Sequence, residues 1–120
     1  MKEVSFFENR LIIDGLEVRF RYNIKQFVEF DNAVVVRLEM KARDDDINNV
    51  YGVVDGKIAW RVQDMLEYDK NCAPFVPDPY TGIRVYEKDR NIIVATTFQG
   101  FRFLINPHNG RIIGTESWVK

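Results

Sequence analysis

Residues 49–60 read NVYGVVDGKIAW, which places the pair Asp55-Gly56 between two short apolar runs. An Asp-Gly pair in this position is a strong signal of a β-hairpin, because a type I′ turn needs positive φ at both of its central residues. The same arrangement occurs earlier in the chain, at Asp14-Gly15. Both stretches therefore predict antiparallel strands joined by tight turns.

Further polar turns separate apolar runs along the rest of the chain. They lie at Asp31-Asn32, at residues 88–90 and at residues 106–110. Together with the two Asp-Gly pairs, these turns predict five hairpins, and most connections join neighbouring runs. The fold class predicted is all-β: an antiparallel meander of about ten strands in hairpins, with two blade-like repeats that form an open barrel or packed sheets.

Several of these runs alternate apolar and polar side chains, as in residues 16–22, 36–41 and 57–62. Alternation with a period of two indicates strands with one buried and one solvated face. We expect the apolar phase to form the core. Its predicted members include Phe20, Val36, Leu38, Trp60, Phe103 and Ile105.

Composition agrees with a β-rich domain. Val and Ile total 25 of the 120 residues, against 10 for Leu and Ala, and residues 1–120 are expected to form a single domain. The net charge of −1 argues against binding of nucleic acid by bulk electrostatics. The chain has a single cysteine, its first twenty residues are charged, and no apolar run approaches the ~20 residues of a membrane span. These features predict a cytoplasmic protein without membrane contact.

The chain also contains a weak internal repeat, which relates residues 27–62 to residues 85–116. Residues 49–60, and more loosely 101–113, resemble the blade signature of quinoprotein-type β-propellers, in which a strand ends in Asp, a Gly and a basic residue follow, and the next strand carries Trp. The resemblance implies four-stranded meanders. Two copies do not close a propeller, which usually takes about four to eight blades, so no cofactor is carried over.

No catalytic constellation is predicted. Cys72 and His108 are the single residues of their kinds, and neither Ser5 nor Ser117 lies in a nucleophile elbow. One Cys and one His are too few for a usual zinc site, and the acidic run at residues 44–46 lacks the spacing of a calcium loop. The sequence predicts a protein that is not an enzyme and that has no cofactor and no metal.

A set of arginines on the polar phase of strands has two readings. They are Arg19, Arg21, Arg37, Arg61, Arg84 and Arg102. They could form a surface for an acidic partner or single-stranded nucleic acid, or they could form cross-strand ion pairs. The glutamates interspersed among them favour ion pairs.

Two function classes remain open. The first is a small cytosolic interaction module that binds another protein, a class that includes toxin-neutralising immunity proteins. The alternative is a β domain that binds a small ligand or carbohydrate, suggested by its 16 aromatic residues. An exposed patch of about 800 Å² would favour a protein partner. A concave pocket lined by Trp and Tyr would favour a small ligand. Unpaired sheet edges also leave room for homo-oligomers.

The predicted binding surface lies around the connection at residues 71–81, which contains three prolines. Because proline fixes φ and lacks an amide donor, this segment is not a central strand. We expect an ordered connection between the two halves of the repeat that presses an apolar side chain onto the sheet. The residues assigned to this surface are Phe75, Tyr80, Arg84 and Tyr86.

Overall fold

The computed structural model describes residues 3–30, 32–39, 47–69 and 78–116. This part of the chain contains eleven strands and one short helix. The elements are β1 (Val4–Phe7), β2 (Arg10–Ile13), β3 (Leu16–Arg19), β4 (Ile24–Glu29), β5 (Val34–Leu38), β6 (Val50–Val54), β7 (Lys57–Arg61), α1 (Met65–Tyr68), β8 (Tyr80–Val85), β9 (Ile93–Thr97), β10 (Arg102–Ile105) and β11 (Ile112–Thr115).

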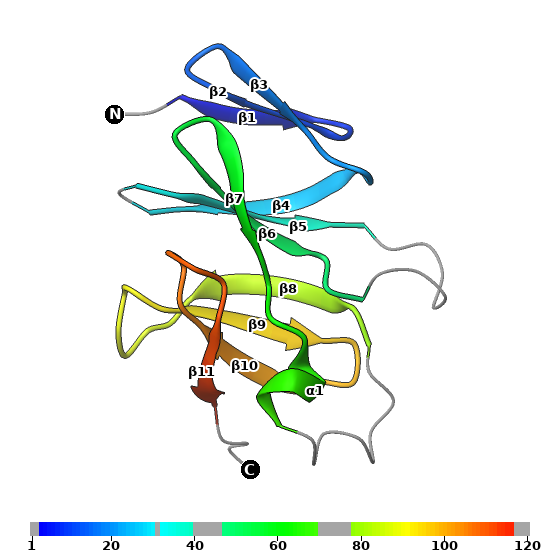
Figure 1. Cartoon of the computed structure of the whole chain (residues 1–120), viewed down its shortest axis with the longest axis vertical. Helices are drawn as coiled ribbons and strands as arrows, with labels where there is room; N and C mark the ends of the chain where they lie inside the picture. Colours follow the sequence, from blue (N-terminus) through cyan, green and yellow to red (C-terminus); the bar gives the residue numbers. More distant parts are fainter. Residues whose placement is uncertain (1–2, 31, 40–46, 70–77, 117–120) are drawn as a thin grey trace.

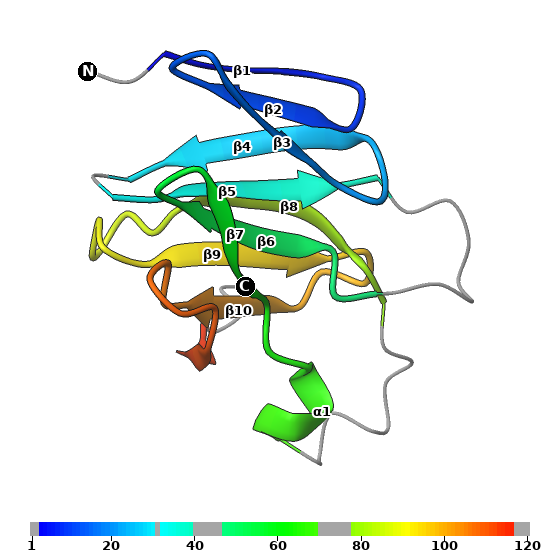
Figure 2. The same ribbon diagram turned by 45° about the horizontal axis from the view of Figure 1, so that its top comes forward.

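The strands form three antiparallel sheets, each a meander in chain order: β1–β3, β4–β7 and β8–β11. The sheets are stacked along the longest axis of the molecule, with β1–β3 at one end and β8–β11 at the other (Figure 1). The view in Figure 2 shows the same order. The all-β meander is confirmed, and of the two arrangements predicted the molecule adopts packed sheets.

Two core layers separate the three sheets. The first, between β1–β3 and β4–β7, contains Leu11, Ile13, Val18, Phe20, Ile24, Val34, Val36, Leu38 and Val53. The second, between β4–β7 and β8–β11, contains Val35, Val50, Trp60, Val62, Met65, Tyr80, Ile83, Ile93, Ala95, Phe103, Ile105 and Ile112. All six residues predicted for the core are buried.

The central sheet is buried on both faces, which the alternation of residues 36–41 did not predict. In β5, Val34 and Val36 face the first core layer and Val35 faces the second, so three consecutive side chains are buried. A strand covered on both faces reads as a continuous apolar run. Arg37 on the same strand is half-buried, and this burial lowers the pKa of its guanidinium.

The predicted Asp-Gly turns have the backbone conformation that their sequences require. Both residues have positive φ in each turn, 49° and 85° at Asp14-Gly15 and 53° and 75° at Asp55-Gly56. The β1–β2 hairpin was not predicted. Its turn is formed by Glu8 and Asn9, and Glu8 takes a φ of 55° although the sequence there has no glycine.

The β6–β7 hairpin contains a bulge that changes which side chains are buried. Trp60 pairs with Gly52 and Ile58 pairs with Val53, so Ala59 is the extra residue. Because adjacent residues of β6 face opposite sides of the sheet, the bulge places Ile58 and Trp60 on opposite faces. Ile58, predicted on the same buried phase as Trp60, is therefore 45% exposed.

The Trp60 indole lies between two glycines. A Cβ atom added to Gly52 would lie 2.0 Å from Trp60 Cε2, and one added to Gly110 would lie 2.4 Å from Cε3. Trp60 Nε1 donates a 2.8 Å hydrogen bond to the Pro107 carbonyl. The indole therefore holds the β10–β11 turn against the edge of the central sheet, and glycine is required on both of its faces.

Two side-chain amides, the buried one of Asn49 and the half-buried one of Gln26, also join the central sheet to β8. Asn49 Nδ2 donates to the carbonyls of Leu38 (2.7 Å) and Tyr80 (3.0 Å), and Tyr80 N donates to Asn49 Oδ1 (2.9 Å). Gln26 makes a similar pair with Ile83, in which Nε2 donates to the carbonyl (2.7 Å) and Oε1 accepts from the amide (3.1 Å). Each amide supplies the hydrogen bonds that a neighbouring strand would supply.

We predict that Gly52→Ala lowers the free energy of unfolding by about 3 kcal/mol, because the added methyl group displaces the indole of Trp60. Gly82→Ala is the matched control, since a Cβ there meets nothing within 4 Å, and it should change stability by less than about 1 kcal/mol. Urea titration of both variants measures the difference. Equal midpoints would contradict the position of the indole.

We also predict that Asn49→Ala lowers the free energy of unfolding by about 3 kcal/mol, because it leaves the buried amide of Tyr80 and the carbonyl of Leu38 without partners. The adjacent Asn48 is the control. Its amide donates a longer bond of 3.4 Å to Asp64, and Asn48→Ala should cost about 1 kcal/mol or less. Thermal unfolding of both variants tests the ranking.

Candidate functional site

The structure describes three of the four residues predicted for the binding surface, and one of these three is buried. Phe75 lies outside the described residues. Tyr80 is only 1% exposed and its ring packs edge-on against Phe103, with the centroids 6.3 Å apart, because β8 begins at Tyr80 with its side chain in the second core layer. Arg84 is exposed on β8, and Tyr86 is half-buried directly after that strand. The assignment of Tyr80 to an exposed surface is wrong.

The arginines singled out in the sequence are distributed over all three sheets. Arg84 and Arg102 lie on the β8–β11 sheet and share one carboxylate oxygen of Glu116, at 2.8 and 3.5 Å. Arg19 lies on β3 and Arg37 on β5. Arginines on different sheets do not form a single polynucleotide-binding face, and those on β8–β11 form the cross-strand ion pairs expected from the mixed charges.

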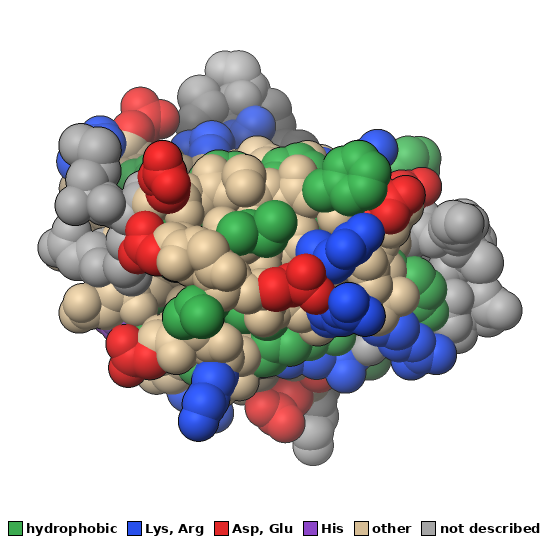
Figure 3. Space-filling view, turned by 90° about the horizontal axis from the view of Figure 1, so that it is seen from above, with side chains coloured by type: hydrophobic (Ala, Val, Ile, Leu, Met, Phe, Trp, Pro, Cys, Tyr) green, Lys and Arg blue, Asp and Glu red, His purple; other side chains and the backbone are tan. Residues whose placement is uncertain are grey.

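A more promising surface is the side of the β1–β3 sheet that faces away from the core. Strand register places six side chains there, in two rows across the strands: Ser5, Ile12 and Glu17, and then Phe7, Arg10 and Arg19. We call these six residues the β1–β3 outer face. Figure 3 views this end of the molecule and shows apolar side chains exposed beside basic and acidic ones.

Phe7 lies at a corner of the β1–β3 outer face, on the edge strand β1, and 62% of its surface is exposed. The guanidinium of Arg10 lies 5.8 Å from the centroid of its ring, a distance typical of a cation–π contact. Phe7 is thus a large aromatic side chain fixed at one end of a rigid hairpin, with a cation beside it.

The charges of the β1–β3 outer face form a connected group. Arg19 Nε donates to Glu17 Oε2, and Arg10 lies 4.0 Å from the other oxygen of Glu17. The hydrogen bond from Arg19 is the main cause that lowers the pKa of the Glu17 carboxyl. Arg19 is therefore hydrogen-bonded to Glu17, whereas Arg10 lies equally far, 4.0 Å, from a carboxylate oxygen of Glu8 and of Glu17. The side chains of Arg10 and Arg19 are 39% and 70% exposed.

Two exposed aliphatic side chains lie at the tips of neighbouring hairpins and are not part of the β1–β3 outer face. Leu16 follows the β2–β3 turn and is 65% exposed, although its strand phase predicted burial. Strand register pairs Leu16 with Ile13, on the side of the sheet that faces the first core layer. Its Cδ1 atom lies 3.7 Å from the position of a Cβ added to Gly56, in the β6–β7 turn that precedes Ile58, which is 45% exposed.

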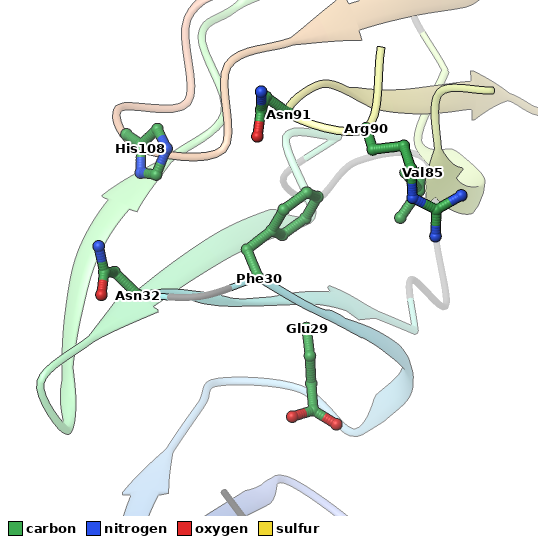
Figure 4. A pocket seen from close by; sticks show the side chains of 7 residues that line it. All are labelled: Glu29, Phe30, Asn32, Val85, Arg90, Asn91 and His108. Atoms are coloured by element: carbon green, nitrogen blue, oxygen red, sulfur yellow. The ribbon is translucent and has the colours of Figure 1, made fainter. Parts of the chain in front are cut away.

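A cleft of about 420 Å³ lies elsewhere, where turns of the other two sheets meet. We call it the hairpin-end cleft. The end of β4 and the β4–β5 turn contribute Glu29, Phe30 and Asn32. The end of β8 and the β8–β9 loop contribute Val85, Arg90 and Asn91, and the β10–β11 loop contributes His108. Figure 4 shows the ring of Phe30 at the centre of this group and the side chain of Glu29 extending away from it.

Sequence reasoning missed this cleft because its residues come from three turns that are far apart in the chain. Each turn was recognised, but nothing in the sequence indicates that the turns of different sheets converge. The one available signal was the repeat itself, because stacked copies of a meander place equivalent turns at the same edge.

Among the described residues, no three His, Cys, Asp or Glu side chains gather where they could hold a metal ion. In the same part of the chain, α1 is the one helix, and its four residues are far too short to cross a bilayer.

The fold and these surfaces define a small all-β domain of stacked antiparallel meanders. The chain belongs to the family described as domain of unknown function DUF7957, whose model matches residues 1–117. No curated protein and no solved structure matches the chain. The matching family is not a β-propeller family, so the resemblance to propeller blades stands only for the four-stranded meander.

We predict that Glu17 titrates below its ordinary pKa and that Arg19→Gln moves this pKa upward more than Arg10→Gln does, because the hydrogen bond from Arg19 is the largest cause. Since the pKa is lowered in the folded protein, the contact stabilises the fold above the unfolded-state pKa and is lost as the pH falls through the folded-state pKa. An NMR titration of the side-chain carboxyl measures each value. An unchanged pKa in Arg19→Gln would show that the contact does not form in solution.

Proposed function

We propose that this chain is a non-catalytic module that binds another protein through the β1–β3 outer face. The observation that carries the proposal is the exposed ring of Phe7 beside Arg10 on the β1–β3 outer face, which also carries Arg19. Aromatic residues and arginine are enriched among the residues that dominate binding energy at protein interfaces.

The partner should be complementary in chemistry. Phe7 would enter an apolar pocket, and acidic groups of the partner would meet the exposed sides of Arg10 and Arg19. Because Arg19 already donates to Glu17, its guanidinium loses less side-chain freedom on binding than that of an isolated arginine would. A toxin-neutralising immunity protein would be one member of this class, acting in the cytoplasm.

The alternative, a carbohydrate-binding domain, has less support. Such a site would use exposed Trp and Tyr side chains on a concave surface. Trp60 and Tyr80 are buried, and Phe30 is the single aromatic residue among the described residues that line the hairpin-end cleft. The distribution of aromatic side chains therefore favours a protein partner.

The experiment places a photo-crosslinking amino acid at Ser5, within the β1–β3 outer face, or at Phe98 as a control. Phe98 is 74% exposed in the turn between β9 and β10, on a different sheet. In cells that express the full chain, we expect position 5 to crosslink to one protein and position 98 not to do so. Mass spectrometry identifies that protein.

The purified partner is then titrated against two matched variants. Phe7→Ser should weaken binding about thirtyfold, the effect of losing an interface residue worth roughly 2 kcal/mol, whereas Phe98→Ser should leave Kd unchanged. Equal affinity of the wild type and Phe7→Ser would refute the proposed surface. A crosslink to a second copy of the chain would replace the proposed partner with a homo-oligomer.

A further inference from the structure

The hairpin-end cleft has no part in the proposed protein interface, because it lies between the second and third sheets and the β1–β3 outer face lies at one end of the stack. We propose that this cleft binds a small anionic ligand with a planar, hydrogen-bonding ring, of the class of nucleoside monophosphates.

The loop that carries His108 is held in place before any ligand binds. Its Pro107 carbonyl accepts the 2.8 Å hydrogen bond from the indole of Trp60. Asn106 Oδ1 accepts from the amide of His108 at 2.8 Å, and Asn106 O accepts from the amide of Gly110 at 2.8 Å. A binding loop fixed in this way avoids part of the ordering cost of binding.

The other two turns are closed by their own backbone and carboxylate groups. Asp89 Oδ1 accepts from the amide of Asn91 at 3.0 Å, and Asp89 O accepts from Ile92 at 3.0 Å. The amide of Phe30 donates to the Ala33 carbonyl at 2.7 Å across the β4–β5 turn.

These bonds occupy the backbone of the turns and leave the side chains of the cleft available. Four of them have no hydrogen-bond or ion-pair partner within the part of the chain that the structure describes: Asn32, Arg90, Asn91 and His108. A group of unpaired donors and acceptors from three turns, around one cleft, is the arrangement of a ligand site.

The side chains define the chemistry of the ligand. Phe30 packs against the second core layer on one side and lines the cleft on the other, so its ring can stack on a planar group. Asn32 and Asn91 each offer an amide donor and acceptor, which match the hydrogen-bonding edge of a heterocycle. Arg90 offers a planar cation suited to phosphate.

Volume and charge narrow the class further. A cleft of about 420 Å³ matches the lower range of sites for drug-sized molecules and is larger than a bare anion needs. Among the described residues that line the cleft, Arg90 is the single arginine or lysine, and Figure 4 shows the Glu29 side chain extending away from Phe30, so the site offers one cation, which suits one phosphate better than three. A ligand with one phosphate attached to a ring fits both the volume and the charge of the cleft.

The test is calorimetric titration of the full chain with adenosine, guanosine, cytidine and uridine monophosphates, and with the nucleosides and inorganic phosphate separately. At least one monophosphate should bind saturably with one site per chain, and should bind at least about tenfold tighter than its nucleoside or phosphate alone. Absence of saturable binding of all four at millimolar concentrations would overturn the proposal.

Two variants of one loop then separate the site from general electrostatics. Arg90→Gln should weaken binding about tenfold or more, since it removes a charge-assisted hydrogen bond to the phosphate. Lys88→Gln removes the same charge from the same exposed loop but from a residue that does not line the cleft, and it should leave binding unchanged. Equal effects of the two variants would overturn the proposed phosphate position.

The ring contact is tested with Asn91→Ala, an exposed position whose replacement should leave the thermal midpoint unchanged. This variant should weaken binding of the monophosphate about threefold to tenfold and leave binding of inorganic phosphate unchanged. Two results would show that the cleft binds anions without recognising a ring, and would refute this part of the proposal. One is an equal loss of affinity for inorganic phosphate in Asn91→Ala, and the other is binding of phosphate as tight as that of the monophosphate.

Discussion

The packing of the Trp60 indole between two glycines is the constraint on which the arrangement of the second and third sheets depends. One face of the indole lies on Gly52 of the central sheet and the other on Gly110 of the β10–β11 turn, while its N–H group binds the Pro107 carbonyl. Neither contact tolerates a Cβ atom. The bulge at Ala59 is equally necessary, because it turns Trp60 toward the second core layer and Ile58 away from it.

Much of the fold could be predicted from local sequence because its turns are chemically specific. Asp14-Gly15 and Asp55-Gly56 adopt positive φ at both positions, a conformation that few other pairs reach without cost. Which side chains of β7 are buried was not predictable, because nothing in the amino-acid sequence marks the extra residue of the bulge. The first hairpin was missed for a related reason, since Glu8 takes a left-handed conformation that its type rarely adopts.

The candidate sites were harder to predict because they depend on how the sheets stack. Tyr80 was assigned to a surface from its neighbouring prolines, but Asn49 binds its backbone and draws its ring into the second core layer. Phe7 belongs to a short segment in which apolar and polar residues do not alternate, so the sequence did not predict a strand there. The hairpin-end cleft combines Phe30 and His108, 78 positions apart, and only the three-dimensional stacking brings them together.

Every hydrogen-bonded strand pair of the three sheets joins strands that are neighbours in the sequence. The molecule is therefore a nearly linear array, in which the first sheet and the third are coupled through the second. Contacts within each sheet therefore close short segments of chain, whereas contacts between sheets join residues farther apart in the sequence. In such an array, a disturbance at one end reaches the other by way of the central sheet, where β5 and β6 each contribute side chains to both core layers.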